Sequence, residues 1–179
     1  MVVESVSRSE YEANEMTMTI RPAQLNDAPI LAEYNARMAW ETEHKRLDRE
    51  VLKCGVEAVL TSSDRGFYTV VEIGSEVVGQ CLMTFEWSDW RNGWMWWIQS
   101  VYVREDARGN GVWSALYRHL RDRAVGSPDV IGIRLYVERS NAKAKAAYTK
   151  LGMTDAGYDI LEQFPLPGRT LTISTESVN

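Results

Sequence analysis

A turn with two glycines, placed between a strand and a helix, is the part of the sequence best suited to bind an anion. Residues 101–112 hold the end of an apolar strand, then Arg108, Gly109 and Gly111, and then the start of a helix. Glycines let backbone N–H groups converge, and a helix N-terminus adds the positive end of its dipole. Together with the Arg108 guanidinium, these features predict a pyrophosphate site. The stretch has neither the GxxxxGKS/T pattern of a P-loop nor the early position of a dinucleotide-binding fingerprint.

The distribution of charge favours the same region. The chain of 179 residues carries a formal net charge of −5, which argues against a nucleic-acid-binding protein. The net charge is −7 over residues 1–103, +5 over residues 104–150 and −3 over residues 151–179. The basic segment contains the glycine turn and the two helices predicted after it, which is the charge that a ligand with phosphate groups requires.

A second motif begins at Asn141 and reads Asn141-x-x-Ala144-x-x-x-Tyr148-x-x-x-Gly152. Together with Arg108-x-x-Gly111 after a central strand, it resembles the GNAT superfamily of acetyl-CoA-dependent N-acetyltransferases. The resemblance covers roughly residues 17–164, since the order of the predicted strands and helices is also similar.

The resemblance implies an α/β domain with a mixed, mostly antiparallel sheet of six or seven strands and about four flanking helices. Two central strands would splay apart, and the pantetheine arm of acetyl-CoA would enter the gap. Asn141 would hydrogen-bond to that arm, and Tyr148 would face the sulfur. The expected cofactor-binding residues are Val101, Tyr102, Val103, Arg108, Gly109, Asn110, Gly111, Val112, Trp113, Ser114, Asn141 and Tyr148.

Three of these residues have a second interpretation. Asn141 would cap its helix with or without a ligand, and Tyr148 lies on an apolar helical stripe that could belong to the core. Trp113 departs from the family pattern R/Q-x-x-G-x-G/A, which ends in a small residue. A small residue in the first helical turn allows a phosphate to approach closely, so the indole must point away or reshape the site.

Acetyl transfer to an amine requires the neutral nucleophile. An alkylammonium group with a pKa near about 10.4 is almost fully protonated at pH 7, so a carboxylate, or a water that it orients, must accept the proton. Histone-modifying members of the resembled family place a glutamate where Trp97 stands here, so the base must lie elsewhere. Glu86, on the neighbouring strand, is the first candidate. Glu41, Glu43 and Asp89 follow it, and all four also fit the description of ordinary surface carboxylates. The Tyr148 phenol would protonate the departing thiolate, and no metal is required.

Five tryptophans lie within eleven residues: Trp87, Trp90, Trp94, Trp96 and Trp97. One interpretation is a buried strand with a homodimer surface beside it. The other is an aromatic wall for the acceptor, where indole faces and carboxylates hold a cation. The second interpretation gives the expected substrate-binding residues Glu41, Glu43, Trp87 and Asp89, and it favours a cationic or aromatic amine.

Periodicity and turn residues predict the elements that position these groups. Helices are expected at residues 28–40, 48–60, 111–125 and 141–151, the first capped by Asp27. Strands are expected at residues 17–21, 67–73, 77–87, 94–103, 131–137 and 157–164, with another at 171–174. Residues 1–15 are expected to form a flexible tail, and residues 16–175 a single N-acetyltransferase-like domain.

The remaining composition excludes several classes of protein. Cys54 and Cys81 give no disulfide framework and no metal-ligand spacing, so we expect a reducing, cytoplasmic environment. The longest apolar run is far shorter than the roughly 20 residues that a membrane helix needs, and the polar N-terminus does not fit a signal peptide. We therefore expect acetyl-CoA and an amine as partners, with no nucleic acid and no membrane.

Three functions fit the sequence. The first is an acyltransferase that moves an acetyl group from acetyl-CoA to a primary amine of a small molecule or peptide, by direct attack in a ternary complex. The second is a noncatalytic acyl-CoA-binding or sensing module on the same fold, which Trp113 and the missing strand glutamate favour. The third is a protein-interaction domain without a cofactor. The sequence names neither the amine nor the length of the acyl chain.

Overall fold

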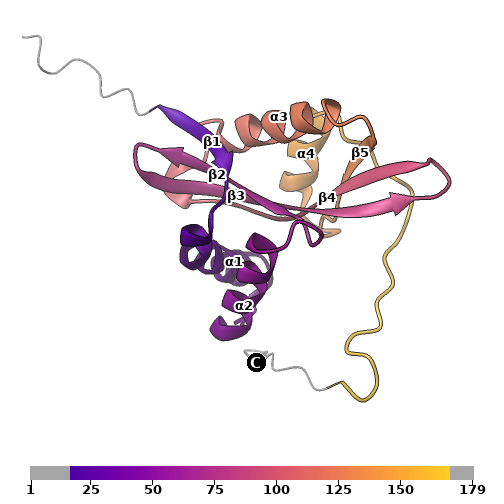
Figure 1. Ribbon diagram of the computed structural model, residues 1–179, viewed down its shortest axis with the longest axis horizontal. Coiled ribbons are helices and arrows are strands. Elements are labelled where there is room, and N and C mark those ends of the chain that lie inside the picture. The colour runs from indigo at the N-terminus through magenta and orange to yellow at the C-terminus, as the bar shows by residue number, and fades with distance from the viewer. Residues whose placement is uncertain (1–16, 170–179) are drawn as a thin grey trace, which may run out of the picture.

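Five strands form one sheet in the part of the chain that the computed structural model describes, residues 17–169 (Figure 1). The strands are β1 (Met18–Pro22), β2 (Phe67–Ile73), β3 (Glu76–Ser88), β4 (Gly93–Val103) and β5 (Val130–Leu135). The helices are α1 (Ala28–Glu43), α2 (Arg49–Leu60), α3 (Val112–Val125) and α4 (Ala142–Lys150), with short 3-10 turns at η1 (Leu25–Asp27) and η2 (Glu105–Ala107).

The sheet is mixed, as predicted. Its strands lie in the order β1-β2-β3-β4-β5, and every neighbouring pair is antiparallel except β4 and β5, which are parallel. The connection between β4 and β5 contains α3, as a parallel crossover requires. The predicted α/β class is confirmed.

The predicted count of six or seven strands is wrong for the described residues. Residues 157–164 form no strand, because no neighbouring strand accepts their hydrogen bonds and their apolar side chains lie in solvent; Leu161 is 96% exposed. Their alternation is that of a half-buried strand, but alternation alone supplies no pairing partner. The predicted strand at 171–174 and the predicted tail at 1–15 lie outside the described residues.

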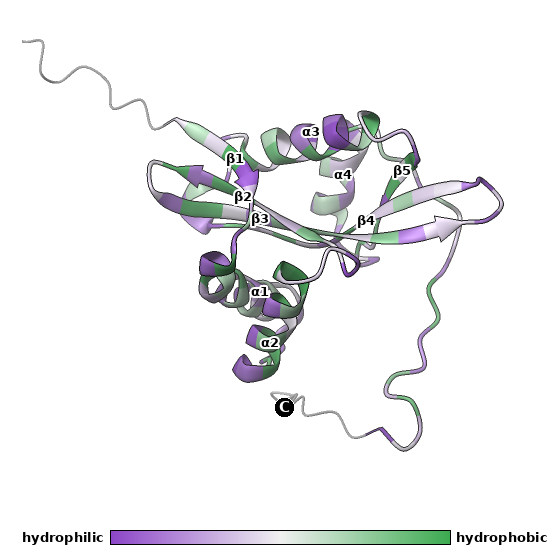
Figure 2. Cartoon of the chain, viewed as in Figure 1, coloured by the Kyte–Doolittle hydropathy of each residue, from purple (hydrophilic) through white to green (hydrophobic). Residues whose placement is uncertain are grey.

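Side chains alternate between two faces of the sheet, and each face has its own layer of helices. Cys81 and Met83 of β3 are fully buried in the cluster that α3 covers with Leu116 and Leu120. On the other face, Leu82 packs with the cluster of α1 and α2. Figure 1 shows α3 and α4 on one side of the sheet and α1 and α2 on the other, and Figure 2 shows that α3 carries both apolar and polar residues.

Local sequence explains how the first two helices begin. Asp48 caps α2 by accepting hydrogen bonds from the backbone N–H groups of Glu50 and Val51. The Asp27 side chain does not cap α1 as predicted, because its carboxylate accepts hydrogen bonds from the Arg21 guanidinium and from the N–H of Gln24 instead. Helix α1 also runs to Glu43, beyond the predicted end at residue 40.

The sheet opens between β4 and β5. Pairing of these two strands ends at Ile98 and Leu135, whereas β4 continues to Val103 and pairs with β3 over that length. A β-bulge accompanies the opening: Leu82 pairs with Ser100 and Met83 with Ile98, so Gln99 is the extra residue. Beyond Ile98, β4 therefore has no neighbour on the side of β5, which is the position of the predicted splay, but β5 is an edge strand of the described sheet and not a central one. No helix among residues 17–169 is long and apolar enough to cross a membrane.

Candidate active site

The turn after β4 leaves backbone N–H groups free to bind an anion. Gly109 and Gly111 have φ values of +83° and +77°, in the left-handed region that glycine adopts most easily. Gly111 is the N-cap of α3, and no side chain within the described part of the chain caps that helix. Gly79 lets the turn approach the sheet, since a Cβ there would lie 3.2 Å from Cγ1 of Val112. The first turn of α3 thus has unsatisfied N–H donors, as anion sites at helix N-termini do.

Arg108 lies beside this turn, but its guanidinium already has partners. Nη2 donates to Oε2 of Glu41 at 2.6 Å, Nε donates to the carbonyl of Val103 at 2.8 Å, and the guanidinium lies 5.4 Å from the Tyr102 ring centre. The Tyr102 hydroxyl donates to the other Glu41 oxygen at 2.9 Å. Although partial burial opposes it, these bonds hold the pKa of Glu41 below its usual value. Glu41, expected at the acceptor, therefore lies at the glycine turn that is expected to bind the cofactor.

The Trp113 indole points from the turn towards α4 rather than into the turn. Its ring lies edge-to-face with Tyr148 (centroids 6.0 Å apart, planes at 87°) and tilted against Tyr117 at 5.7 Å. Burial raises the pKa of Tyr148, so the phenol holds its proton at neutral pH. Asn141 caps α4 by accepting from the N–H of Ala144 at 2.9 Å. Trp113 and Tyr148, separate in the sequence, thus form one aromatic contact.

Glu86 of β3 lies on the face of the sheet that α1 and α2 cover, and its side chain reaches across β4 to Arg134 of β5. Its two carboxylate oxygens accept from Trp97 Nε1 at 2.5 Å and from Arg134 Nη1 at 3.0 Å. The Trp97 ring packs against Tyr136 with centroids 4.4 Å apart, and the Arg134 guanidinium lies 5.7 Å from the Trp97 ring centre. These four residues, Glu86, Trp97, Arg134 and Tyr136, are called the Glu86–Arg134 cluster below. The Glu86 side chain remains 42% exposed and so accessible to a solute.

The other expected substrate-binding residues do not meet Glu86. Trp87 points to the α3 face and packs edge-to-face on Trp94 with ring centroids 5.0 Å apart. Asp89 lies in the β3–β4 turn, where it accepts from the N–H of Trp90. Glu43 pairs with Lys45 at the end of α1. The structure therefore does not assemble the aromatic wall with carboxylates that the tryptophan cluster suggested.

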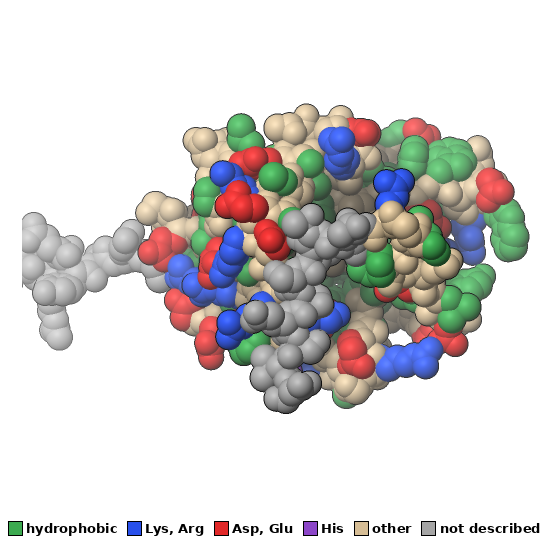
Figure 3. Space-filling view, turned by 90° about the horizontal axis from the view of Figure 1, so that it is seen from below, with side chains coloured by type: hydrophobic (Ala, Val, Ile, Leu, Met, Phe, Trp, Pro, Cys, Tyr) green, Lys and Arg blue, Asp and Glu red, His purple; other side chains and the backbone are tan. Residues whose placement is uncertain are grey.

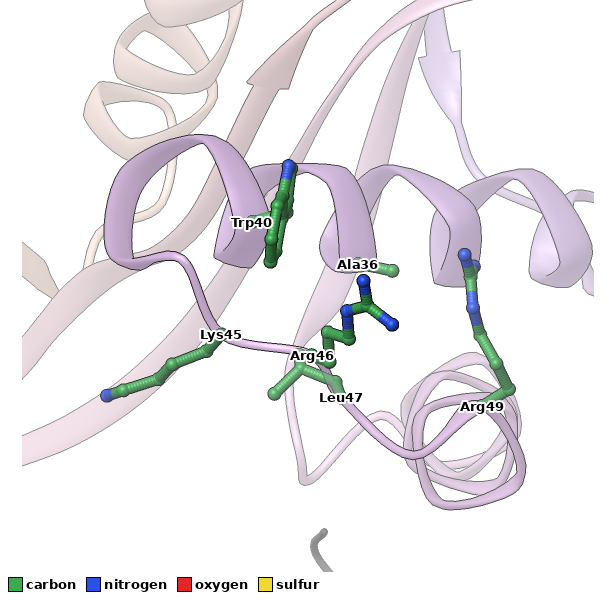
Figure 4. Close-up of a pocket in the computed structure, with 6 residues that line it drawn as sticks. All are labelled: Ala36, Trp40, Lys45, Arg46, Leu47 and Arg49. Atoms are coloured by element: carbon green, nitrogen blue, oxygen red, sulfur yellow. The ribbon is translucent and has the colours of Figure 1, made fainter. Parts of the chain in front are cut away.

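Two cavities lie near α1 and α2. One of about 320 Å³ lies between α2 and the sheet and includes Ser100, next to the bulge at Gln99. Another of about 400 Å³ lies between α1 and the loop that follows it, where Arg46 approaches Trp40 at 5.4 Å while Lys45 points away (Figure 4). None of the residues around the larger cavity belongs to the expected site.

Sequence reasoning missed Arg134, Tyr136 and Gln99. The alternation of the predicted strand at 131–137 could have placed Arg134 and Tyr136 on one face, opposite the apolar side chains. No comparable signal marks Gln99, since a bulge depends on the register of two strands. Cys81, by contrast, is fully buried, and burial raises the pKa of its thiol, which leaves it unsuited to act as a nucleophile.

The order of elements, the splayed sheet and the uncapped glycine turn define an acetyltransferase fold, and comparison with known proteins agrees. Residues 27–153 match the model of the acetyltransferase (GNAT) family, and the chain belongs to that family. A possible acetyltransferase from Clostridium difficile 630 is 40% identical, with a TM-score of 0.78, over 82% of this chain and 96% of that one. Comparison with curated proteins found no match.

More distant solved structures share the fold. Ribosomal-protein-alanine N-acetyltransferase from Brucella melitensis biovar Abortus 2308 is 18% identical, with a TM-score of 0.66, over 83% of this chain and all of that chain (100%). An aminoglycoside N-acetyltransferase in complex with CoA is 11% identical, with a TM-score of 0.69, over 84% of this chain and 96% of that one. At these identities the likeness extends to the fold alone.

Proposed function

We propose that this protein transfers an acetyl group from acetyl-CoA to a primary amine by direct attack in a ternary complex. The observation that carries the proposal is the geometry at the end of β4. There, residues 99–103 have no β5 neighbour, and the uncapped glycine turn follows after the short turn η2. An open strand edge beside a helix N-terminus matches a ligand with amide groups at one end and a pyrophosphate at the other.

The residues present fit acetyl-CoA, which supplies the activated acetyl thioester when bound. Backbone groups at Val101 and Val103 would bind the pantetheine amides. The N–H groups of residues 109–114 would bind the pyrophosphate, because they lack other partners in the described chain. Trp113 presents only its backbone to that turn, since its side chain packs on Tyr148. The indole at a position where the family has a small residue therefore does not block the site.

The reaction requires a base on one side of the opening and an acid on the other. Glu86, with an ordered water where needed, would remove a proton from the ammonium, and the amine lone pair would then form the new C–N bond. A backbone N–H of the bulged β4 segment would donate to the carbonyl oxygen as it gains charge. As the C–S bond breaks, the Tyr148 phenol would give its proton to the thiolate and regain one from solvent. The attacking nitrogen would lose its second proton to solvent, which leaves the neutral amide. The products are the N-acetylated amine and CoA.

A noncatalytic acyl-CoA-binding module is the second candidate. It is favoured by one observation: both groups that catalysis and cofactor binding would use, Glu86 and Arg108, are held in ion pairs by Arg134 and Glu41. Both pairs are partly exposed, however, and such pairs are worth about 1 kcal/mol or less. A ligand can therefore displace either of them at little cost.

The test combines cofactor binding with turnover. We expect acetyl-CoA to raise the melting temperature and thiol release to depend on an added amine from a panel of amino acids, polyamines and peptides. Tyr148→Phe should lower kcat about 10- to 100-fold with little change in the Kd of acetyl-CoA, since general acid catalysis of this kind contributes about that much. Binding without thiol release for any amine would support the noncatalytic module, and the absence of binding would refute both.

A further inference from the structure

The Glu86–Arg134 cluster lies where the acceptor must approach the opening of the sheet. Trp97 and Arg134 are paired across β4 and β5, one position before the pairing ends at Ile98 and Leu135. Glu86, Trp97 and Arg134 share the α1/α2 face, opposite the face that α3 and Tyr148 occupy. Seen from the α1/α2 side, the surface is hollowed near its centre, with acidic and basic side chains around the hollow (Figure 3).

The cluster presents a positive and a negative group side by side, and the Arg134 guanidinium has donors to spare. A guanidinium has five N–H donors. Within residues 17–169, Arg134 uses one of them, in the bond to Glu86, although its side chain is only 25% exposed. Its Cζ lies 5.7 Å from the Trp97 ring centre, and the remaining N–H groups can donate to a planar, bidentate anion, for which guanidinium geometry is well suited.

We propose that the amine acceptor is a free amino acid, whose carboxylate binds Arg134 and whose ammonium binds Glu86. The inference rests on the proposed function and adds the class of acceptor. A bound amino acid would replace the ion pair between Glu86 and Arg134 with two ion pairs to the ligand, one from its carboxylate to Arg134 and one from its ammonium to Glu86. No charge is then left unpaired in the complex. The rings of Trp97 and Tyr136, packed at a tilt of 33°, form the apolar wall beside the acceptor.

This arrangement also frees Glu86 to act as a base when the acceptor binds. In the free protein Arg134 occupies one oxygen of the Glu86 carboxylate. When the acceptor carboxylate takes over the guanidinium, that oxygen becomes available to accept a proton from the ammonium. The N–H bond breaks and an O–H bond forms on Glu86, and the nitrogen attacks the acetyl carbon. The sulfur leaves with the proton from Tyr148, and the second proton of the attacking nitrogen passes to solvent, which leaves the neutral amide. The products are an N-acetyl amino acid and CoA.

The experiment compares each amino acid with its own carboxamide, which keeps the amine and side chain but lacks the negative charge. We expect kcat/KM of the full-length protein to be about 10- to 100-fold higher for the best amino acid than for its carboxamide, the range that charge-assisted bidentate bonds supply. Arg134→Gln should bring that ratio close to one by lowering only the rate with the amino acid. Arg134→Lys should restore part of the ratio. Arg121→Gln removes an exposed arginine of α3 and should leave it unchanged.

Each result decides the question. A ratio near one in the unmodified protein, or faster acetylation of a polyamine or aminoglycoside than of every amino acid, would overturn the amino-acid assignment while leaving acetyl transfer intact. The same holds if Arg134→Gln folds, as shown by an unchanged melting temperature, and keeps the ratio. If no amine in either series releases thiol, both the proposed function and this inference are wrong.

Discussion

Replacing Trp113 with alanine should slow acetyl transfer through Tyr148 while leaving cofactor affinity nearly unchanged. The indole meets the Tyr148 ring edge-to-face at 6.0 Å, and α4 has no fully buried residue of its own. The helix that carries the phenol is therefore held on the body of the protein by a few partly buried side chains, among them Leu151 and Met153. Removing the indole leaves the phenol in place on average but less firmly oriented.

The structure sets the size of the effect. An edge-to-face aromatic pair contributes about 0.5–1.5 kcal/mol beyond the area that it buries. If that energy holds the phenol in its reactive orientation, its loss lowers kcat by up to about tenfold, since 1.4 kcal/mol corresponds to a factor of ten. Fully buried tryptophans cost about 3–5 kcal/mol when replaced by alanine; Trp113 is only partly buried, so we expect about 2 kcal/mol of lost stability.

A double-mutant cycle measures the coupling between the two rings. Values of kcat, and of KM for acetyl-CoA, would be compared for the unmodified protein, Trp113→Ala, Tyr148→Phe and the double variant. We expect Trp113→Ala to lower kcat in the unmodified background and to have almost no effect once the phenol is gone. Trp113→Phe should keep most of the rate, because it keeps an aromatic edge. His119→Ala, an exposed change on the same helix, is the matched control.

One outcome would refute this reasoning. If Trp113→Ala raised KM for acetyl-CoA about tenfold and left kcat unchanged, the indole would act on the pyrophosphate turn and not on Tyr148. Equal losses of kcat in both backgrounds would likewise show that the two rings act independently.

Three further predictions follow from the ion pairs and caps. Glu41→Gln should release Arg108 and lower the Kd of acetyl-CoA about two- to fivefold, since an exposed pair is worth under about 1 kcal/mol; a higher Kd by calorimetry would contradict this. Asn141→Ala should cost about 1 kcal/mol and reduce hydrogen-exchange protection of α4, while Asn141→Asp should retain the cap and the protection. Hydrogen bonds from Arg21 hold the pKa of Asp27 below its usual value, so the stability that ionised Asp27 contributes is present above about pH 4 and is lost as the pH falls below that. Asp27→Asn should therefore lower the free energy of unfolding by about 2 kcal/mol at pH 7. The difference in melting temperature between the two proteins should disappear in acid.

Most of the fold was predictable because the residue patterns that mark its strands, turns and helix caps are local in the sequence. The glycines at 109 and 111, the Asn141 cap and the alternation along β3 act within a few residues of where they stand. The splay, by contrast, was expected only from the family resemblance. Its details, the end of β4–β5 pairing at Leu135 and the bulge at Gln99, depend on register between strands and have no local signal.

Which charged groups meet could not be predicted from spacing. Arg108 and Glu41 are distant in sequence, and they meet because α1 ends beside the turn that follows β4. The face of the predicted strand on which each side chain lies could, however, have been used to test which residues can meet. Alternation along β3 already separates Trp87 from Glu86, so a wall built from both was inconsistent with the predicted strand. The structure places them on opposite faces accordingly.

The two ion pairs have the same effect when no ligand is bound, since each gives an arginine of the candidate site a carboxylate partner. Arg108 pairs with Glu41 at the glycine turn, and Arg134 pairs with Glu86 in the Glu86–Arg134 cluster, so neither cation is left without a partner. Because both pairs are partly exposed, displacing them costs little, whereas a phosphate or carboxylate gains a charge-assisted bond to a guanidinium that neighbouring groups already orient. Tyr102 orients Glu41, and Trp97 orients Glu86. In the proposed reaction, binding of the acceptor to Arg134 would release Glu86, the carboxylate that the proposed chemistry requires as a base.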